Sequence, residues 1–146
     1  GIPDSYKILV CPDRKKADSM AKRLYKKSLE RKELVANIVE EVRERAFGKG
    51  TEAIVFEGSS EWELILVGVA AARLVKEMDK PVFLFQEKNG QIQGSIRAPS
   101  GFNVVEAMKT CSSHLLTYGG HPQAAGFQAK KEEANKFKKC LIDYFS

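Results

Sequence analysis

A chain of 146 residues has the usual length of one compact domain, and its 43% of apolar residues, with eight phenylalanines, suffices for an ordinary hydrophobic core. A charged fraction of 29%, arranged in amphipathic patterns, argues against a disordered chain. The longest uncharged apolar stretch, Leu64 to Ala72, is too short to span a bilayer, and the N-terminus lacks the apolar core of a signal peptide. We therefore expect a soluble, cytoplasmic protein whose net charge of +5 is compatible with a polyanionic partner.

The three cysteines, Cys11, Cys111 and Cys140, are an odd number and lie far apart in the sequence. Because no Cys-x-x-Cys pair or His-x3-His spacing accompanies them, the sequence indicates neither a zinc site nor a disulfide framework. The pattern predicts free thiols, buried or half-buried, in a reducing compartment.

The first expected element is a helix over residues 14–46, a stretch without proline or glycine. Asp13 is a natural N-cap for this helix, and Gly48 follows its end. Apolar residues recur at helical spacing in the second half, but they are sparse in Lys26–Arg31. Two helices joined by a bend are therefore an equal alternative. A basic helical segment of this length is typical of a connector between domains.

A denser α/β pattern follows the helix. A short strand at 53–56, a turn at 58–60, a helix at 64–78 and a strand at 81–85 have βαβ spacing, which predicts a right-handed crossover and a parallel strand pair. Asn89-Gly90 is a strong hairpin signal, so residues 91–97 should return antiparallel to the second strand.

The last third of the chain completes a small mixed sheet. The expected elements there are a helix at 103–114, a glycine-rich turn at 118–122, a strand at 126–129 and a helix at 131–144. The predicted fold class is α/β, a small mixed β-sheet flanked by helices and preceded by a long helical interdomain connector. We assign residues 1–50 to the connector and residues 51–146 to the domain.

The most informative string is GGHPQAAGF, residues 119–127. Gly119 and Gly120 allow a ligand to approach the backbone closely, and a run of backbone N–H donors there forms an anion site. His121 follows directly and can donate to a phosphate oxygen. A bare Gly-Gly-His tripeptide is more often a plain glycine turn with a packed histidine, but the nine-residue string is far more specific.

A second pattern lies in the strand at 91–97, where Ser95 and Arg97 are two residues apart and so share one face. The planar guanidinium of arginine is suited to phosphate, and a neighbouring hydroxyl can assist it. A Ser-x-Arg pair on a strand is more often exposed surface. The preceding glycine and the downstream Gly-Gly-His string favour a binding role here.

This order of motifs resembles the DHH-associated C-terminal domain of RecJ-type exonucleases in the DHH phosphoesterase superfamily. The resemblance runs from Ala53 to Phe127, and its landmarks are Trp62 before a glycine-containing helix, Gly94-Ser95-x-Arg97, and the GGHPQAAGF string. The chain departs from the bacterial pattern at Glu63-Leu64, where a histidine and a small residue are usual, and this suggests a divergent branch.

The resemblance implies a division of labour between two domains. In that family an upstream Asp-His-His domain holds two metal ions, and this sequence contains no counterpart, so Mn or Mg is expected in the missing N-terminal catalytic domain and no cofactor in this chain. Ser95 and Arg97 would bind one substrate phosphate, and Gly119, Gly120 and His121 another nearer the metals. His121 is the one catalytic candidate, as a stabiliser of the transition state. The isolated chain is expected to be inactive.

The resemblance also implies partners and alternatives. The expected partners are single-stranded DNA or RNA, the missing catalytic domain, and replication or repair proteins, with no membrane. One alternative is the same module from a phosphodiesterase of short oligonucleotides or cyclic dinucleotides; such relatives usually carry a third glycine before the histidine, where this chain has Tyr118. The other is a non-catalytic scaffold of a replication complex.

Overall fold

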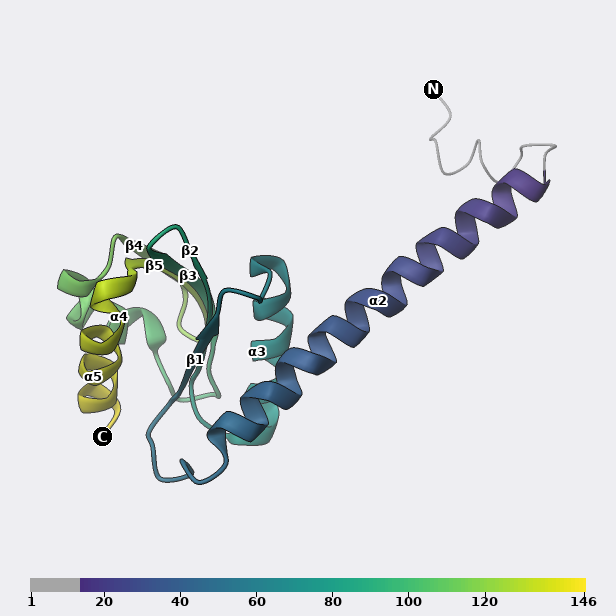
Figure 1. The fold of residues 1–146 in the computed structure, drawn as a ribbon. Helices are drawn as coiled ribbons and strands as arrows, with labels where there is room; N and C mark the ends of the chain where they lie inside the picture. Colours follow the sequence, from purple (N-terminus) through teal and green to yellow (C-terminus); the bar gives the residue numbers. More distant parts are fainter. Residues whose placement is uncertain (1–13) are drawn as a thin grey trace. The chain divides into compact units, whose positions relative to one another are not determined.

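A computed structural model describes residues 14–146, coloured from purple to yellow in Figure 1. The chain divides into two units, residues 1–34 and 35–146, and the second unit contains the sheet. Helix α2 (Arg14–Ala46) is a single helix by its hydrogen bonding, so the alternative of two helices is not realised. The Lys, Leu, Glu and Arg residues at 26–31 sustain the helix because all four are good helix formers. The predicted cap at Asp13 lies outside the described residues.

The sheet has five strands in the order β1-β2-β3-β5-β4. The strands are β1 (Val55–Ser59), β2 (Val82–Lys88), β3 (Gln91–Arg97), β4 (Thr117–His121) and β5 (Ala124–Lys130). Strands β1 and β2 are parallel and are joined through helix α3 (Leu64–Met78), whereas the other pairs are antiparallel. The prediction of a mixed α/β sheet after a long N-terminal helix is confirmed.

Two predicted turns are strands instead. Strand β1 continues through Gly58, where a turn was expected, because Gly58 and Ser59 pair with β2; only glycine fits at 58, since a Cβ atom there would overlap the ring of Phe85. The segment 117–121 pairs in full with β5, and the chain reverses only at Pro122-Gln123. That reversal is held in place by two backbone hydrogen bonds, from Ala98 N–H to the Gln123 carbonyl at 3.0 Å and from Val104 N–H to the Pro122 carbonyl at 2.9 Å.

Helices α4 (Val104–Thr110) and α5 (Ala134–Phe145) cover one face of the sheet (Figure 1). Both are shorter than predicted, because a 3-10 turn follows α4 at Ser112–His114 and another precedes α5 at Lys131–Glu133. The ring of Phe137 on α5 is fully buried, with its centroid 5.2 Å from that of Phe127 and 6.2 Å from that of Phe83. This aromatic cluster forms the centre of the core on the α4/α5 side.

Cys111 and Cys140 form a disulfide between the end of α4 and α5, with their Cα atoms 5.9 Å apart. The prediction of free thiols is therefore wrong for these two residues, and Cys11 lies outside the described residues. The two cysteines are 29 positions apart in the sequence, and the packing of α4 beside α5 brings them together.

The opposite face of the sheet is covered in part by α3, which packs against β2 and β3. Within residues 35–146, the last three turns of α2 pack in the same cluster as α3, through Val35, Ile38, Val39 and Val42. Trp62 is 4% exposed, and its Nε1 donates to Glu41 at 3.1 Å. Trp62 is therefore a packing residue of this cluster and is not available for base stacking.

None of the helices within residues 14–146 is both long enough and apolar enough to cross a membrane.

Candidate nucleic-acid interface

The predicted site residues lie on two strands that flank a third. Ser95 and Arg97 belong to β3, Gly119, Gly120 and His121 belong to β4, and β5 runs between the two strands. The spacing between neighbouring strands is about 4.8 Å, so residues of β3 and β4 in the same row are roughly 10 Å apart.

The strand register brings four of these positions to one face. Ser95 pairs with Gly126, which in turn pairs with Gly119; Arg97 pairs with Ala124, which in turn pairs with His121. Directly paired residues occupy the same face of a sheet. Two adjacent cross-strand rows therefore hold the predicted residues, and both rows belong to the face on which α3 packs.

Gly120 does not join the other four. It pairs with Ala125, whose side chain belongs to the core on the α4/α5 side. Its φ is 134°, and a Cβ atom here would lie 2.6 Å from the Cα of Ala125 and 2.7 Å from the carbonyl oxygen of Ala124. Gly120 is thus required by the backbone conformation and the close approach of β5.

Helix α3 leaves room for Ser95 and Arg97 at Gly68. A Cβ atom at Gly68 would lie 3.3 Å from the Ser95 Oγ and 3.5 Å from the Arg97 Nη2. Arg97 is half-buried, and its Nη1 donates to the Ile96 carbonyl at 2.8 Å. The other guanidinium N–H groups have no partner within residues 14–146. Sequence reasoning did not assign Gly68 to the site, although a glycine inside a helix is unfavourable by about 1 kcal/mol and so signals a packing reason.

A hollow of about 360 Å³ adjoins the row of Ser95 and Gly119. Its lining residues come from β3, β4 and β5: Gln93, Gly94, Thr117, Tyr118, Gly119, Gly126, Phe127 and Gln128. Gln93 pairs with Gln128, which pairs with Thr117, so these three form the next row on the same face. Sequence reasoning missed this row, because isolated polar residues on strands carry no signal until the register is known.

The charges on this face suit an anion. Over β2 to β5, the paired positions of this face include the cations Lys88, Arg97 and Lys130 and no carboxylate. Glu57 lies on the same face in β1, where Lys49 at 3.2 Å and Arg45 at 3.6 Å pair with it. A surface with one sign of charge favours a polyanion.

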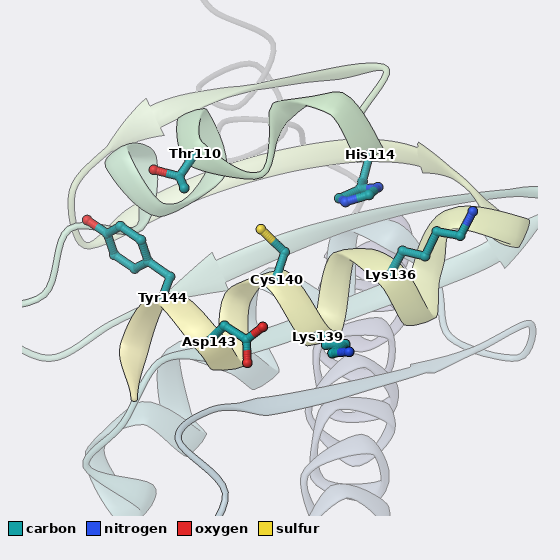
Figure 2. A pocket seen from close by; sticks show the side chains of 7 residues that line it. All are labelled: Thr110, His114, Lys136, Lys139, Cys140, Asp143 and Tyr144. Atoms are coloured by element: carbon teal, nitrogen blue, oxygen red, sulfur yellow. The ribbon is translucent and has the colours of Figure 1, made fainter.

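A second hollow, of about 540 Å³, lies between α4, the turn after it and α5 (Figure 2). Its lining residues are Thr110, His114, Lys136, Lys139, Cys140, Asp143 and Tyr144. The Nδ1 of His114 lies 3.0 Å from an oxygen of Glu133, and Cys140 is in the disulfide. None of the predicted site residues lines this hollow. In the described part of the chain, no three His, Cys, Asp or Glu side chains gather as a metal site would require.

The DHHA1 domain family matches residues 48–146 of the chain. The single-stranded-DNA-specific exonuclease RecJ of Bacillus subtilis is 29% identical over 137 residues, which cover 92% of this chain and 17% of that protein. RecJ of Thermus thermophilus is 33% identical over 79 residues, covering 54% of this chain and 11% of that protein. The chain thus spans less than a fifth of the length of either relative.

The fold of this chain is also similar to solved structures of RecJ. The crystal structure of exonuclease RecJ bound to manganese superimposes with a TM-score of 0.80 at 24% identity, over 94% of this chain and 34% of that one. RecJ from Thermus thermophilus in complex with Mn²⁺ gives a TM-score of 0.77 at 26% identity, over 93% of this chain and 20% of that one. The fold implied by the sequence resemblance is confirmed.

Proposed function

The chain belongs to the DHHA1 domain family, and from that premise we propose that it binds single-stranded nucleic acid for a RecJ-like exonuclease. In this proposal residues 51–146 bind the phosphates of the strand, and residues 1–50 connect them to an N-terminal domain that hydrolyses the phosphodiester bond. The solved RecJ structures contain Mn²⁺ or Mg²⁺. Because residues 14–146 contain no cluster suited to a metal, we assign the metals to that other domain.

The proposal rests mainly on the shared row of Arg97 and His121. Among the described residues, Arg97 has guanidinium N–H groups without a partner beside the Ser95 hydroxyl, and charge-assisted hydrogen bonds from arginine suit a phosphate. His121 is exposed at the far end of the row, with only the small Ala124 between them. Gly119 and Gly120 keep the backbone beside His121 free of side chains. We assign His121 to a phosphate close to the reacting bond, where it stabilises the transition state.

Salt-dependent binding tests the phosphate contact. Arg97→Ala in this chain should weaken binding to a single strand and lower the slope of log affinity against log salt by roughly one unit, because one phosphate contact is lost. Its free energy of unfolding should change by less than about 0.5 kcal/mol. The control is Lys136→Ala, an exposed cation at the second hollow, which should leave binding and slope unchanged. Wild-type affinity of Arg97→Ala at every salt concentration contradicts the proposal.

Two kinetic expectations concern catalysis. The purified chain should not hydrolyse single-stranded DNA in the presence of manganese. This expectation is contradicted if the purified chain cleaves the DNA and a substitution within residues 14–146 abolishes that cleavage. In the parent enzyme, His121→Ala should lower single-turnover cleavage more than binding, since a transition-state contact acts on the rate. His114→Ala, at the other histidine, is the control and should retain normal turnover.

The same proposal places the protein in the cytoplasm, with replication or repair proteins among its partners. Neither a cyclic-dinucleotide phosphodiesterase nor a non-catalytic scaffold is favoured by a specific observation.

A further inference from the structure

We propose that the hollow beside Ser95 and Gly119 is a nucleobase subsite, in which the side-chain amides of Gln93 and Gln128 bind the edge of a base. This inference deepens the proposed function and rests on it, since the base belongs to the strand whose phosphates Arg97 contacts. It assigns to this chain a contact with the bases in addition to the backbone contacts already described.

The position of the glutamines relative to the phosphate-binding residues carries the first part of the argument. Gln93 and Gln128 are direct partners across β3 and β5, and Gln86 on β2 extends the same row. Residues two positions apart on a strand are about 7 Å apart along it. The glutamine row therefore lies about 7 Å from the row of Ser95 and about 13 Å from Arg97, within the reach of a neighbouring nucleotide.

The floor of the hollow is formed by two glycines that the fold itself does not need. Gly119 and Gly126 are direct partners in the interior of paired strands, where glycine weakens a sheet. Neither glycine is required by the fold. A Cβ atom at Gly119 would meet nothing within 4 Å, one at Gly126 would meet only the Gly94 carbonyl oxygen at 3.4 Å, and neither residue has a positive φ. A strand glycine without a packing reason marks a place where a ligand approaches the backbone.

The shape that results fits a planar ring. Two adjacent glycines expose a flat strip of backbone, and the hollow of about 360 Å³ above it lies within the usual range for small-ligand sites. The side chains of Gln93, Gln128 and Thr117 belong to the row along one border of this strip, and Ser95 stands at the end of the strip on β3. A base lying on the glycines would present its edge to the amides.

The chemistry of the row suits a base better than a phosphate. Each glutamine amide supplies both a donor and an acceptor, which matches the mixed pattern on base edges, and adenine in particular accepts a bidentate glutamine. The side-chain amides of Gln93 and Gln128 make no hydrogen bond within residues 14–146. Single strands leave base edges free for such contacts. Because the glutamines carry no charge, they would add little to the binding of a phosphate that Arg97 already contacts.

The experiment compares two strands of equal length and charge. One is an oligodeoxyadenylate, and the other has the same backbone with abasic residues throughout. Wild-type chain should bind the base-bearing strand about tenfold more tightly, the size expected for one bidentate contact. The double variant Gln93→Leu/Gln128→Leu keeps the side-chain bulk and removes the amides. It should bind both strands with the affinity that wild type shows for the abasic one.

Arg97→Ala distinguishes the base subsite from the phosphate contact on which it rests, because this substitution should weaken the binding of both strands by the same factor. If wild type binds both strands alike while Arg97→Ala weakens both, the base subsite is wrong and the phosphate contact stands. If the double variant weakens the abasic strand as well, the glutamines contact the backbone and the base subsite is again wrong. If Arg97→Ala changes neither strand, the proposed phosphate contact fails, and the double variant then tests the glutamines alone. Unchanged denaturation midpoints for all variants exclude misfolding as the cause.

Discussion

The two faces of the sheet differ in what their side chains do, although the same strands build both. On the α4/α5 face, Ile92 and Ile96 of β3 are fully buried in the aromatic core. On the opposite face, Gln93, Ser95 and Arg97 of the same strand are exposed or half-buried, because α3 extends over only part of the sheet. Alternation along a single strand thus gives one face to the core and leaves the other for the binding that we propose.

That division makes a testable distinction between variants. Substitutions on the α4/α5 face should change the free energy of unfolding and leave the salt dependence of binding intact. Substitutions on the open face should do the reverse.

The largest expected effect is that of Phe137→Ala. This ring is fully buried and lies within 6.2 Å, centroid to centroid, of Phe56, Phe83 and Phe127, so its removal should lower the free energy of unfolding by about 3–5 kcal/mol. Urea denaturation measures this, with Tyr144→Ala, an exposed residue of the same helix, as the control. A loss below about 1 kcal/mol, or a changed salt slope in the folded variant, would contradict this division of roles between the two faces.

Reduction of the disulfide should have the next largest effect, a loss of about 2–4 kcal/mol, because the bridge closes a long loop in the unfolded chain. The unfolded protein should titrate one thiol before dithiothreitol and three after it, since two of the three cysteines are bonded. The variant Cys111→Ala/Cys140→Ala should be insensitive to dithiothreitol. Three reactive thiols in the unreduced chain would refute the bridge.

Two neighbouring glycines of β4 allow a structural role and a binding role to be tested separately. Gly120→Ala should cost about 1–3 kcal/mol, because alanine is strained at a φ of 134° and its Cβ would press on Ala125. Gly119→Ala should change the free energy of unfolding by less than about 0.5 kcal/mol, because its Cβ would enter open space, yet it should weaken binding of base-bearing strands. Denaturation and binding assays on both variants decide this. If Gly119→Ala and Gly120→Ala lower the free energy of unfolding equally, Gly119 has a structural role as well.

The smallest expected effect concerns Glu77, on the outside of α3. A side-chain hydrogen bond from Arg43 lowers the pKa of Glu77 below its usual value. A carboxylate with a lowered folded-state pKa adds stability above its unfolded pKa, and this contribution is lost as pH falls through the folded pKa. Both side chains are exposed, so the effect is small. Glu77→Gln should be slightly less stable than wild type at pH 7, and the difference should disappear at acid pH. A difference that persists or grows in acid would contradict this origin.

Local signals predicted much of the fold. The helix at 64–78 was predicted with the bounds observed, because its apolar residues stand between clear polar ends. The hairpin at Asn89-Gly90 was also correct, and both residues have the positive φ values, 53° and 72°, that its turn requires. In both cases the decisive information lies within a few neighbouring residues.

Features that depend on distant partners could not be predicted in this way. Glycine is unfavourable in strands, so Gly119 and Gly120 indicated a turn, and only the pairing with β5 makes that segment a strand. The bridge between Cys111 and Cys140 depends on the packing of α4 against α5. The local patterns and the resemblance indicated Arg97 and His121 as candidate site residues, but only the strand register revealed that they share one row and that a row of glutamines lies on the same face.

Strand β4 ends the sheet, and an unpaired border of backbone groups is a template on which a second chain can add a strand. Here the border is only five residues long, contains two glycines and is followed at once by Pro122. Short length, low strand propensity and an adjacent proline all discourage such addition. Gly119, which we propose as part of the floor of the base subsite, therefore also helps to protect the molecule against edge-to-edge aggregation, and Gly119→Val should lower solubility together with binding.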